Sequence, residues 1–199
     1  VVVRGCAFED GRPMNEQEAL QEVERIRAEM QNKLGTGRFP NWIGPQRFGS
    51  GRSVTAEVGR FVVQQQWAEA VHTYISKEGE HESPEVATFR KHVRENGITK
   101  EGLALAPDWL GYERRMTEHL LENPEDCVGA FRKLPNNLQL MTIHALQSVV
   151  FNRSLRHRLE NGISITKPEA GDLVGRLDEK GQLSANNCVI VEELSLIHI

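Results

Sequence analysis

The sequence predicts an α/β or α+β protein in which helices dominate, and three observations support this fold class. The chain opens on a β-branched run, residues 1–4, which is typical of a strand. Apolar residues then recur at steps of three and four over much of the chain up to residue 160, which is the period of amphipathic helices. Beyond Gly162 the sequence is turn-rich, with short strand-like runs near residues 173–175 and 188–191. A strand followed by a helix indicates layers that combine both kinds of element.

The first predicted helix follows Asn15, a residue type that is favoured at the N-cap. Glu16 and Glu18 place acidic groups in its first turn, where they suit the helix dipole. Gly35 and Gly37 end the pattern. The apolar stripe between these limits consists of Leu20, Val23, Ile26, Met30 and Leu34.

Residues 35–53 form a long predicted loop with five glycines, two prolines and the aromatic residues Trp42 and Phe48. A loop of this length is uncommon unless it is functional or disordered, and its aromatic content disfavours disorder. It lacks the spacing of a nucleotide-binding P-loop. Its amide and guanidinium groups are suited to hydrogen bonding with a ligand, although they could equally satisfy the loop's own backbone.

Further helices are expected over about residues 54–76, 84–95, 112–121, 124–133 and 137–160. The last of these is largely apolar, yet His144, Ser148 and Asn152 recur along it at four-residue spacing. Buried polar groups need partners, because an unsatisfied one costs about 1–3 kcal/mol. The partners could be backbone groups of a neighbouring segment or a ligand.

Composition argues against several classes of protein. No apolar run reaches the roughly 18 residues of a membrane helix, and nothing resembles a signal peptide. Three scattered cysteines and the absence of an HExxH motif argue against a disulfide framework and a metal site. We therefore expect no metal and a reducing, cytoplasmic setting.

The net charge of −4 conceals two basic islands. Residues 36–66 carry four arginines against Glu57, and residues 131–160 carry five basic groups against Glu160. Contacts with nucleic-acid phosphates need such islands, although charges can also cluster by chance on solvated faces.

Two segments carry a resemblance to a known family. The loop Asn41-Trp-Ile-Gly-Pro-Gln-Arg-Phe-Gly49 resembles the N-x-F-G-x-Q-R-F-G signature of TruD-type tRNA pseudouridine synthases. The helix at residues 134–152 ends in His-Ala-x-Gln-Ser-x-x-Phe-Asn and resembles their second signature in its archaeal and eukaryotic form. The order of the two segments and the sequence around Gly171 also fit.

The resemblance implies that residues 1–66 are part of a pseudouridine synthase catalytic core and that residues 67–199 are an incomplete TruD-type insertion domain. It implies an enzyme that isomerises a specific uridine in tRNA without a cofactor. Because the chain starts without Met in a strand-like run and stops in an apolar segment, we expect a fragment. The family's nucleophilic Asp is expected upstream of Val1, so no catalytic residue is predicted here and the fragment alone is expected to be inactive. The alternative is a non-catalytic RNA-binding or scaffold fragment.

The site residues that the resemblance implies fall into two groups. Ile43 stands where the family usually has Phe packed near the target base, which leaves Asn41 as the better candidate for ordering the active site. The active-site loop comprises Asn41, Ile43, Gly44, Gln46, Arg47, Phe48 and Gly49. The RNA-binding candidates are Arg38, Arg52, His144, Gln147, Arg153 and Arg156.

Overall fold

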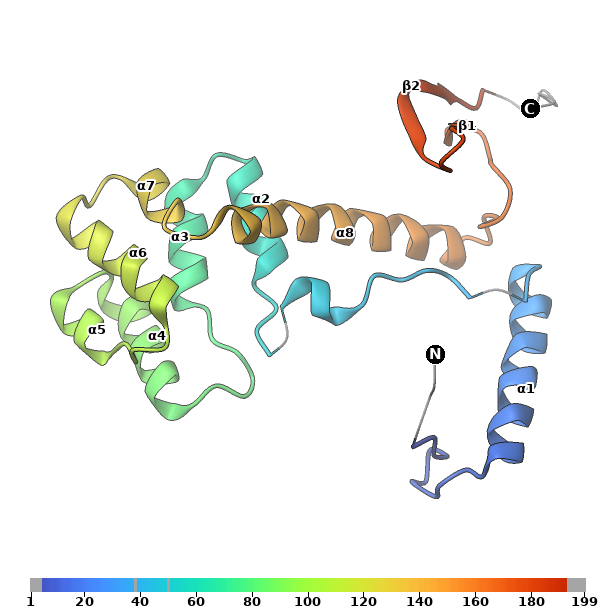
Figure 1. Ribbon diagram of the computed structural model, residues 1–199, viewed down its shortest axis with the longest axis horizontal. Coiled ribbons are helices and arrows are strands. Elements are labelled where there is room, and N and C mark those ends of the chain that lie inside the picture. Colours follow the sequence, from blue (N-terminus) through green and yellow to red (C-terminus); the bar gives the residue numbers. More distant parts are fainter. Residues whose placement is uncertain (1–4, 38, 50, 193–199) are drawn as a thin grey trace. The chain divides into compact units, whose positions relative to one another are not determined.

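The computed structural model describes residues 5–37, 39–49 and 51–192, which form two compact units (Figure 1). One unit is the continuous segment Trp42–Arg153, and the other combines Val1–Asn41 with Ser154–Ile199. The predicted strand at residues 1–4 lies outside the described residues.

The unit Trp42–Arg153 is a helical bundle. Its core contains the fully buried side chains of Val58, Ile75, Phe89, Met116 and Leu134. Figure 1 shows α3 to α7 gathered into one cluster. The elements are η1 (Pro45–Phe48), α2 (Thr55–Val63), α3 (Trp67–Ser76), α4 (Pro84–Asn96), α5 (Lys100–Leu105), α6 (Gly111–Glu122), α7 (Cys127–Phe131) and the first part of α8 (Asn136–Glu160).

The single helix predicted over residues 54–76 was wrong, because the chain turns between α2 and α3. Gln65 has a positive φ of 59°, and the amide of Gln66 donates to the carbonyl of Phe61 (2.9 Å). The two helices pack against each other. An unbroken helix of this length would extend roughly 34 Å and could not bring both halves into one core.

The other helix boundaries in the bundle differ less from the predicted ones. Helix α7 begins after Asp126, whose side chain accepts a hydrogen bond from the amide of Gly129 (2.8 Å), and not at Pro124 as predicted. Helix α5 was not predicted; the hydroxyl of Thr99 caps it by accepting from the amide of Gly102 (2.9 Å). Short helices of this kind carry too little apolar periodicity to be detected from sequence.

Helices α2 and α8 approach each other closely at Gly59. A Cβ atom at Gly59 would lie 2.0 Å from the carbonyl oxygen of Thr142 in α8. Both residues are buried, so the absence of a side chain at Gly59 is what allows this contact.

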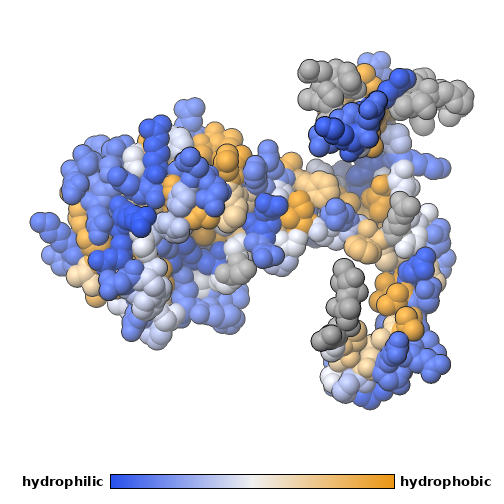
Figure 2. Space-filling model, viewed as in Figure 1, coloured by the Kyte–Doolittle hydropathy of each residue, from blue (hydrophilic) through white to orange (hydrophobic). Residues whose placement is uncertain are grey.

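In the other unit, α1 (Glu16–Leu34) starts and ends as the sequence predicts. The side chain of Asn15 accepts from the amide of Glu18, and the side chain of Glu18 accepts from the amide of Asn15, both at 2.9 Å. Gly35 ends the helix in a left-handed conformation. No residue of α1 is buried, and Figure 2 shows hydrophobic side chains exposed along it.

The same unit contains the end of α8 and a two-stranded antiparallel sheet of β1 (Leu173–Leu177) and β2 (Leu183–Ile190). Arg158 in the last turn of α8 donates to the carboxylate of Asp172 (2.5 Å) and to the carbonyl of Ser164 (2.8 Å), which ties the helix end to the segment before β1. Both strands were predicted, with the second beginning earlier than expected. Helices with a small antiparallel sheet confirm the expected class in its α+β form.

The predicted domain boundary after residue 66 falls between α2 and α3, inside one compact unit. The assignment of residues 1–66 to a synthase core therefore stays a prediction. Within the described residues, no helix is long and apolar enough to cross a membrane, and no three His, Cys, Asp or Glu side chains gather as they would around a metal ion.

Candidate functional site

The signature loop is ordered around a short 3₁₀ helix. Pro45 occupies the first position of η1, and the amide of Arg47 donates to the carbonyl of Gly44 (3.2 Å). Gly49 follows with a φ of 107°, and a Cβ there would lie 2.3 Å from the carbonyl oxygen of Arg52. Only glycine fits this turn, because both the backbone conformation and the available space exclude a side chain.

One residue of α8 holds this loop. The side-chain oxygen of Asn152 accepts from the amide of Ile43 (3.0 Å), and its side-chain nitrogen donates to the carbonyl of Ile43 (2.9 Å). The side-chain amide of Asn152 thus satisfies both the N–H and the C=O group of Ile43, which lies 109 positions away in the chain. The loop and the helix predicted as separate motifs are joined at this point.

A surface cleft of about 430 Å³ lies beside this junction. It is lined by Ile43, Gly44, Gln46 and Arg47 from the loop and by Met141 from α8. The volume lies within the range of about 300–1,000 Å³ that small-molecule sites occupy. The cleft combines an apolar wall with an amide and a guanidinium group.

The polar residues predicted along α8 lie in different environments. Asn152 bonds the loop, and the hydroxyl of Ser148 donates to the carbonyl of His144 (2.8 Å) in the same helix. The side chains of His144 and Gln147 are exposed instead. Of the two kinds of partner that the sequence left open, the structure shows backbone groups of a neighbouring segment for Asn152. Ser148 bonds the backbone of its own helix, which was not among the predicted partners.

A family model of tRNA pseudouridine synthase D (TruD) matches residues 1–198 of the chain. The chain belongs to the TruD family. This confirms the resemblance that the two signatures indicated. The junction between Ile43 and Asn152 lies within the matched residues and joins the two segments that resemble TruD signatures.

Archaeal proteins are similar in sequence to this chain. The chain is 41% identical over 152 residues to "Probable tRNA pseudouridine synthase D" of Methanopyrus kandleri, which covers 76% of the chain and 38% of the relative. It is 44% identical over 148 residues to the protein of the same name from Methanosarcina acetivorans, covering 74% and 34%. The chain thus spans little more than a third of the length of these relatives.

A solved TruD structure supports the fold directly. The crystal structure of a TruD protein from Methanosarcina mazei matches 90% of this chain with a TM-score of 0.76 and 35% sequence identity. The match covers 41% of that protein. The α+β architecture described above is therefore one that a TruD family member adopts.

The TruD loop residues and RNA candidates lie in several environments. Asn41 is exposed and is the last residue of its compact unit, so its predicted role stays a prediction. Arg153 is exposed at the end of the other unit. Arg156 is exposed and pairs with Glu160 (2.7 Å), while Arg38 lies outside the described residues.

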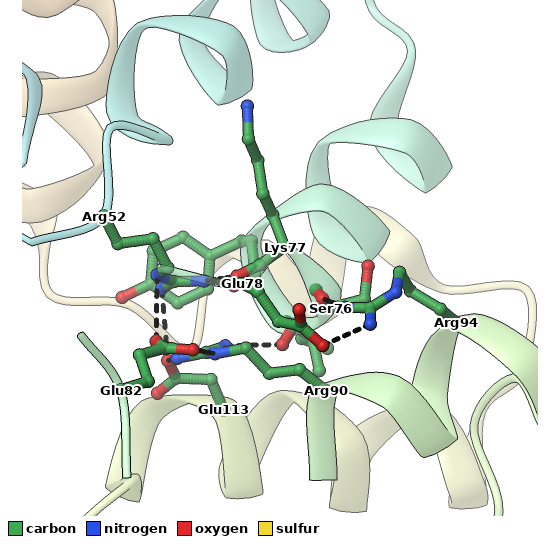
Figure 3. A network of polar contacts seen from close by, with 10 residues as sticks. Arg52, Ser76, Lys77, Glu78, Glu82, Arg90, Arg94 and Glu113 are labelled. Carbon is green, nitrogen blue, oxygen red and sulfur yellow. Dashed lines mark hydrogen bonds and ion pairs between the residues drawn. The ribbon is translucent and has the colours of Figure 1, made fainter. Parts of the chain in front are cut away.

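Arg52 does not present its charge to solvent (Figure 3). Its side chain is 14% exposed and donates to the carbonyls of Tyr74 and Lys77 and to the carboxylate of Glu113. This environment argues against the predicted RNA contact of Arg52, because its donors already have partners inside the protein. The sequence offered no signal for this, since Glu113 lies 61 positions further along the chain.

The same buried charges change the ionisation of Tyr74. Burial, together with the nearby carboxylate of Glu113, raises the pKa of Tyr74 from its ordinary value of 10.0 to about 12. Between these two values the unfolded chain loses the phenolic proton while the folded protein retains it. The free energy of unfolding is therefore expected to fall as the pH rises through this range.

The ultraviolet absorbance of tyrosinate, taken as the difference between the wild-type protein and the Tyr74→Phe variant, measures this ionisation. We expect the difference signal to titrate near pH 12 in the folded protein and near pH 10 after denaturation. A signal near pH 10 in the folded protein would show that Tyr74 is not in the buried environment described here.

Proposed function

We propose that the protein is a tRNA pseudouridine synthase that isomerises one uridine of a tRNA, and that the cleft beside the signature loop forms one wall of its active site. The observation that carries this proposal is the pair of hydrogen bonds between Asn152 and Ile43. They hold two TruD signature segments together around the cleft. The names of the archaeal relatives support the same activity.

The reaction needs a base to be exposed and held. The glycosidic bond between N1 of the uracil and C1′ of the ribose breaks, the base rotates, and a bond forms between C5 and C1′. The hydrogen on C5 leaves as a proton and N1 gains one, so no oxidant or cofactor is required. A base inside a folded tRNA must leave its stack to be reached.

The groups that line the cleft suit such a substrate. Ile43 and Met141 offer apolar surface to a base, and Gln46 offers an amide for its polar edge. Arg47 is exposed and forms no ion pair with any described residue, so its guanidinium is available to a phosphate. None of the cleft-lining residues is Asp. The resemblance to the TruD family implies that the nucleophilic Asp belongs to a part of the protein outside this chain, so we expect the chain alone to be inactive.

Basic residues of the Trp42–Arg153 unit support contacts with the tRNA backbone. Arg132, Lys133 and Arg153 are exposed and, like Arg47, form no ion pair within the described part of the chain. Arg60, Lys100 and Arg115 are also exposed without an ion pair among the described residues, whereas Arg52, Lys77, Arg90, Lys91, Arg94 and Arg114 are paired with carboxylates. We infer that the unpaired groups bind phosphates, with His144 and Gln147 as further contacts on α8, and that the enzyme acts in the cytoplasm.

Release of tritium from tRNA that carries C5-tritiated uridine tests the proposal in the full-length protein. We expect release to accompany pseudouridine formation. We also expect the affinity for tRNA to fall steeply with salt, because phosphate contacts displace counterions. Salt-sensitive binding of tRNA without any tritium release would favour the alternative, a non-catalytic RNA-binding protein.

A further inference from the structure

Three arginines cap the C-terminal end of α3 (Figure 3). The last carbonyls of a helix have no partner within the helix and carry the negative end of its dipole, so guanidinium groups suit this position. The arginines come from the segment before α2 and from α4, and the carbonyls that they bond are consecutive. Arg52 donates to Tyr74 (2.6 Å) and Lys77 (3.2 Å), Arg90 to Ile75 (2.6 Å) and Arg94 to Ser76 (2.7 Å).

Two of these arginines also belong to a buried, charge-balanced cluster. Arg52 and Arg90 donate to the same carboxylate oxygen of Glu113 at 3.3 and 3.2 Å, and Arg90 bonds the carboxylate of Glu82 at 2.9 Å. Arg90 is 2% exposed and Glu113 7%. Because burying an unpaired charge is costly, the loss of any one of these four groups is expected to destabilise the cluster.

Within this cluster, Arg52 is the member that continues from the signature loop. It lies three residues beyond Gly49, and the ideal Cβ of Gly49 would lie 2.3 Å from the carbonyl oxygen of Arg52. The ideal Cβ of Gly79 would lie 2.5 Å from the carbonyl oxygen of Gly51. The backbone at Gly51, which precedes α2, is therefore in close contact with the segment between α3 and α4.

We infer that Arg52 is a positioning residue of the proposed synthase, whose guanidinium anchors the end of the signature loop to the α3–α4–α6 bundle. The loop is then held at two points, by Asn152 at Ile43 and by Arg52 beyond Gly49. Helices α3, α4 and α6 thereby set the shape of the cleft without lining it. This inference rests on the proposed function.

Arg94 provides a control for the capping of α3, and it lies outside the buried cluster. It caps the same end of α3 and pairs with Glu78, but none of its bonds reaches the segment that follows the loop. A comparison of Arg52→Gln with Arg94→Gln in the full-length protein separates anchoring of the loop from capping of α3. Arg52→Lys serves as a milder variant that keeps the charge but loses the forked geometry, should Arg52→Gln fail to fold.

Two readouts are needed. Tritium release from C5-labelled tRNA gives kcat and KM, and hydrogen exchange reports on the amides of Ile43 and Arg47. For Arg52→Gln we expect kcat to fall about tenfold with KM changed less than about twofold, because the loop is misplaced and not removed. Exchange at the two amides is expected to be about tenfold faster. Arg52→Lys is expected to fall between this variant and the wild type, and Arg94→Gln should match the wild type in both readouts.

An Arg52→Gln protein with wild-type exchange and wild-type kcat would overturn the inference. So would an Arg94→Gln protein with the same losses, since the effect would then come from general destabilisation of α3. If the wild-type protein releases no tritium, the proposed function is rejected, whereas the exchange comparison still decides whether Arg52 holds the loop.

Discussion

Replacing Asn152 by Leu is expected to lower the rate of pseudouridine formation by about 100-fold, because the variant releases Ile43 from α8. Both hydrogen bonds between these residues disappear, and each is worth about 1 kcal/mol. The backbone groups of Ile43 would then be free to move away from the wall of the cleft. Tritium release from C5-labelled tRNA by the full-length protein measures the effect.

The loss is expected mainly in kcat, since Asn152 positions the loop and does not line the cleft itself. Asn152→Asp should be similarly impaired, because a carboxylate can accept from the amide of Ile43 but cannot donate to its carbonyl. Asn137→Leu is the matched control. Asn137 is exposed on the same helix and its side chain makes no hydrogen bond with the described residues, so its replacement should change the rate less than about twofold. Equal losses in Asn152→Leu and Asn137→Leu would contradict a specific role for Asn152.

Replacing Gly59 by Ala is expected to destabilise the bundle by about 3 kcal/mol. The new Cβ would lie 2.0 Å from the carbonyl oxygen and 2.6 Å from the carbonyl carbon of Thr142, which belong to the backbone of α8. A backbone cannot move aside as a flexible side chain can, so α2 and α8 must separate. The higher helix propensity of Ala offsets only about 1 kcal/mol of this cost.

Thermal unfolding followed by circular dichroism measures this change, and we expect the transition to fall by on the order of 10 °C. Gly111→Ala makes the same substitution at the start of α6, where a Cβ would meet nothing within 4 Å. That variant should be as stable as the wild type or more stable by about 0.5 kcal/mol. If Gly59→Ala unfolds at the same temperature as Gly111→Ala, α2 and α8 do not approach each other as described.

Local signals in the sequence were sufficient for several elements. The helix α1 follows from one apolar stripe between Asn15 and Gly35, and both caps have the geometry that their residue types favour. The start of α8 was predicted to within one residue for a similar reason, because its apolar residues keep helical spacing over many turns. Such signals depend on neighbours in the chain.

The break between α2 and α3 did not have a signal of this kind. Residues 64–66 are all Gln, which tolerates a helix well, and Gln65 nevertheless adopts a positive φ. The turn is stable because it lets α2 and α3 pack on each other and on the same core. Tertiary packing outweighs local preference here.

The candidate site also combines features that local sequence predicts with features that depend on tertiary packing. The sequence identified the signature loop, the helix with His144, Ser148 and Asn152, and two basic islands, but it could not say which polar residue meets the loop. It also assigned Arg52 to RNA, whereas Arg52 lies in a buried cluster with Arg90 and Glu113. The partners of Arg52 come from α3 and α6, and nothing near Arg52 in the sequence indicates them.

By itself, the sequence determined the family, the position of both signature segments and the extent of the long helices, since motif spacing and periodicity are properties of short stretches of chain. It did not determine which faces of α1 and α8 are buried, because no residue of α1 is buried and the buried residues of α8 are Thr142, Ala145 and Ser148. Only the tertiary structure decided that Asn152 binds Ile43 and that Arg52 is anchored to α3. Contacts between residues 109 and 22 positions apart depend on how the intervening helices pack. That packing follows from shape, burial and charge balance over the whole bundle, which no local pattern records.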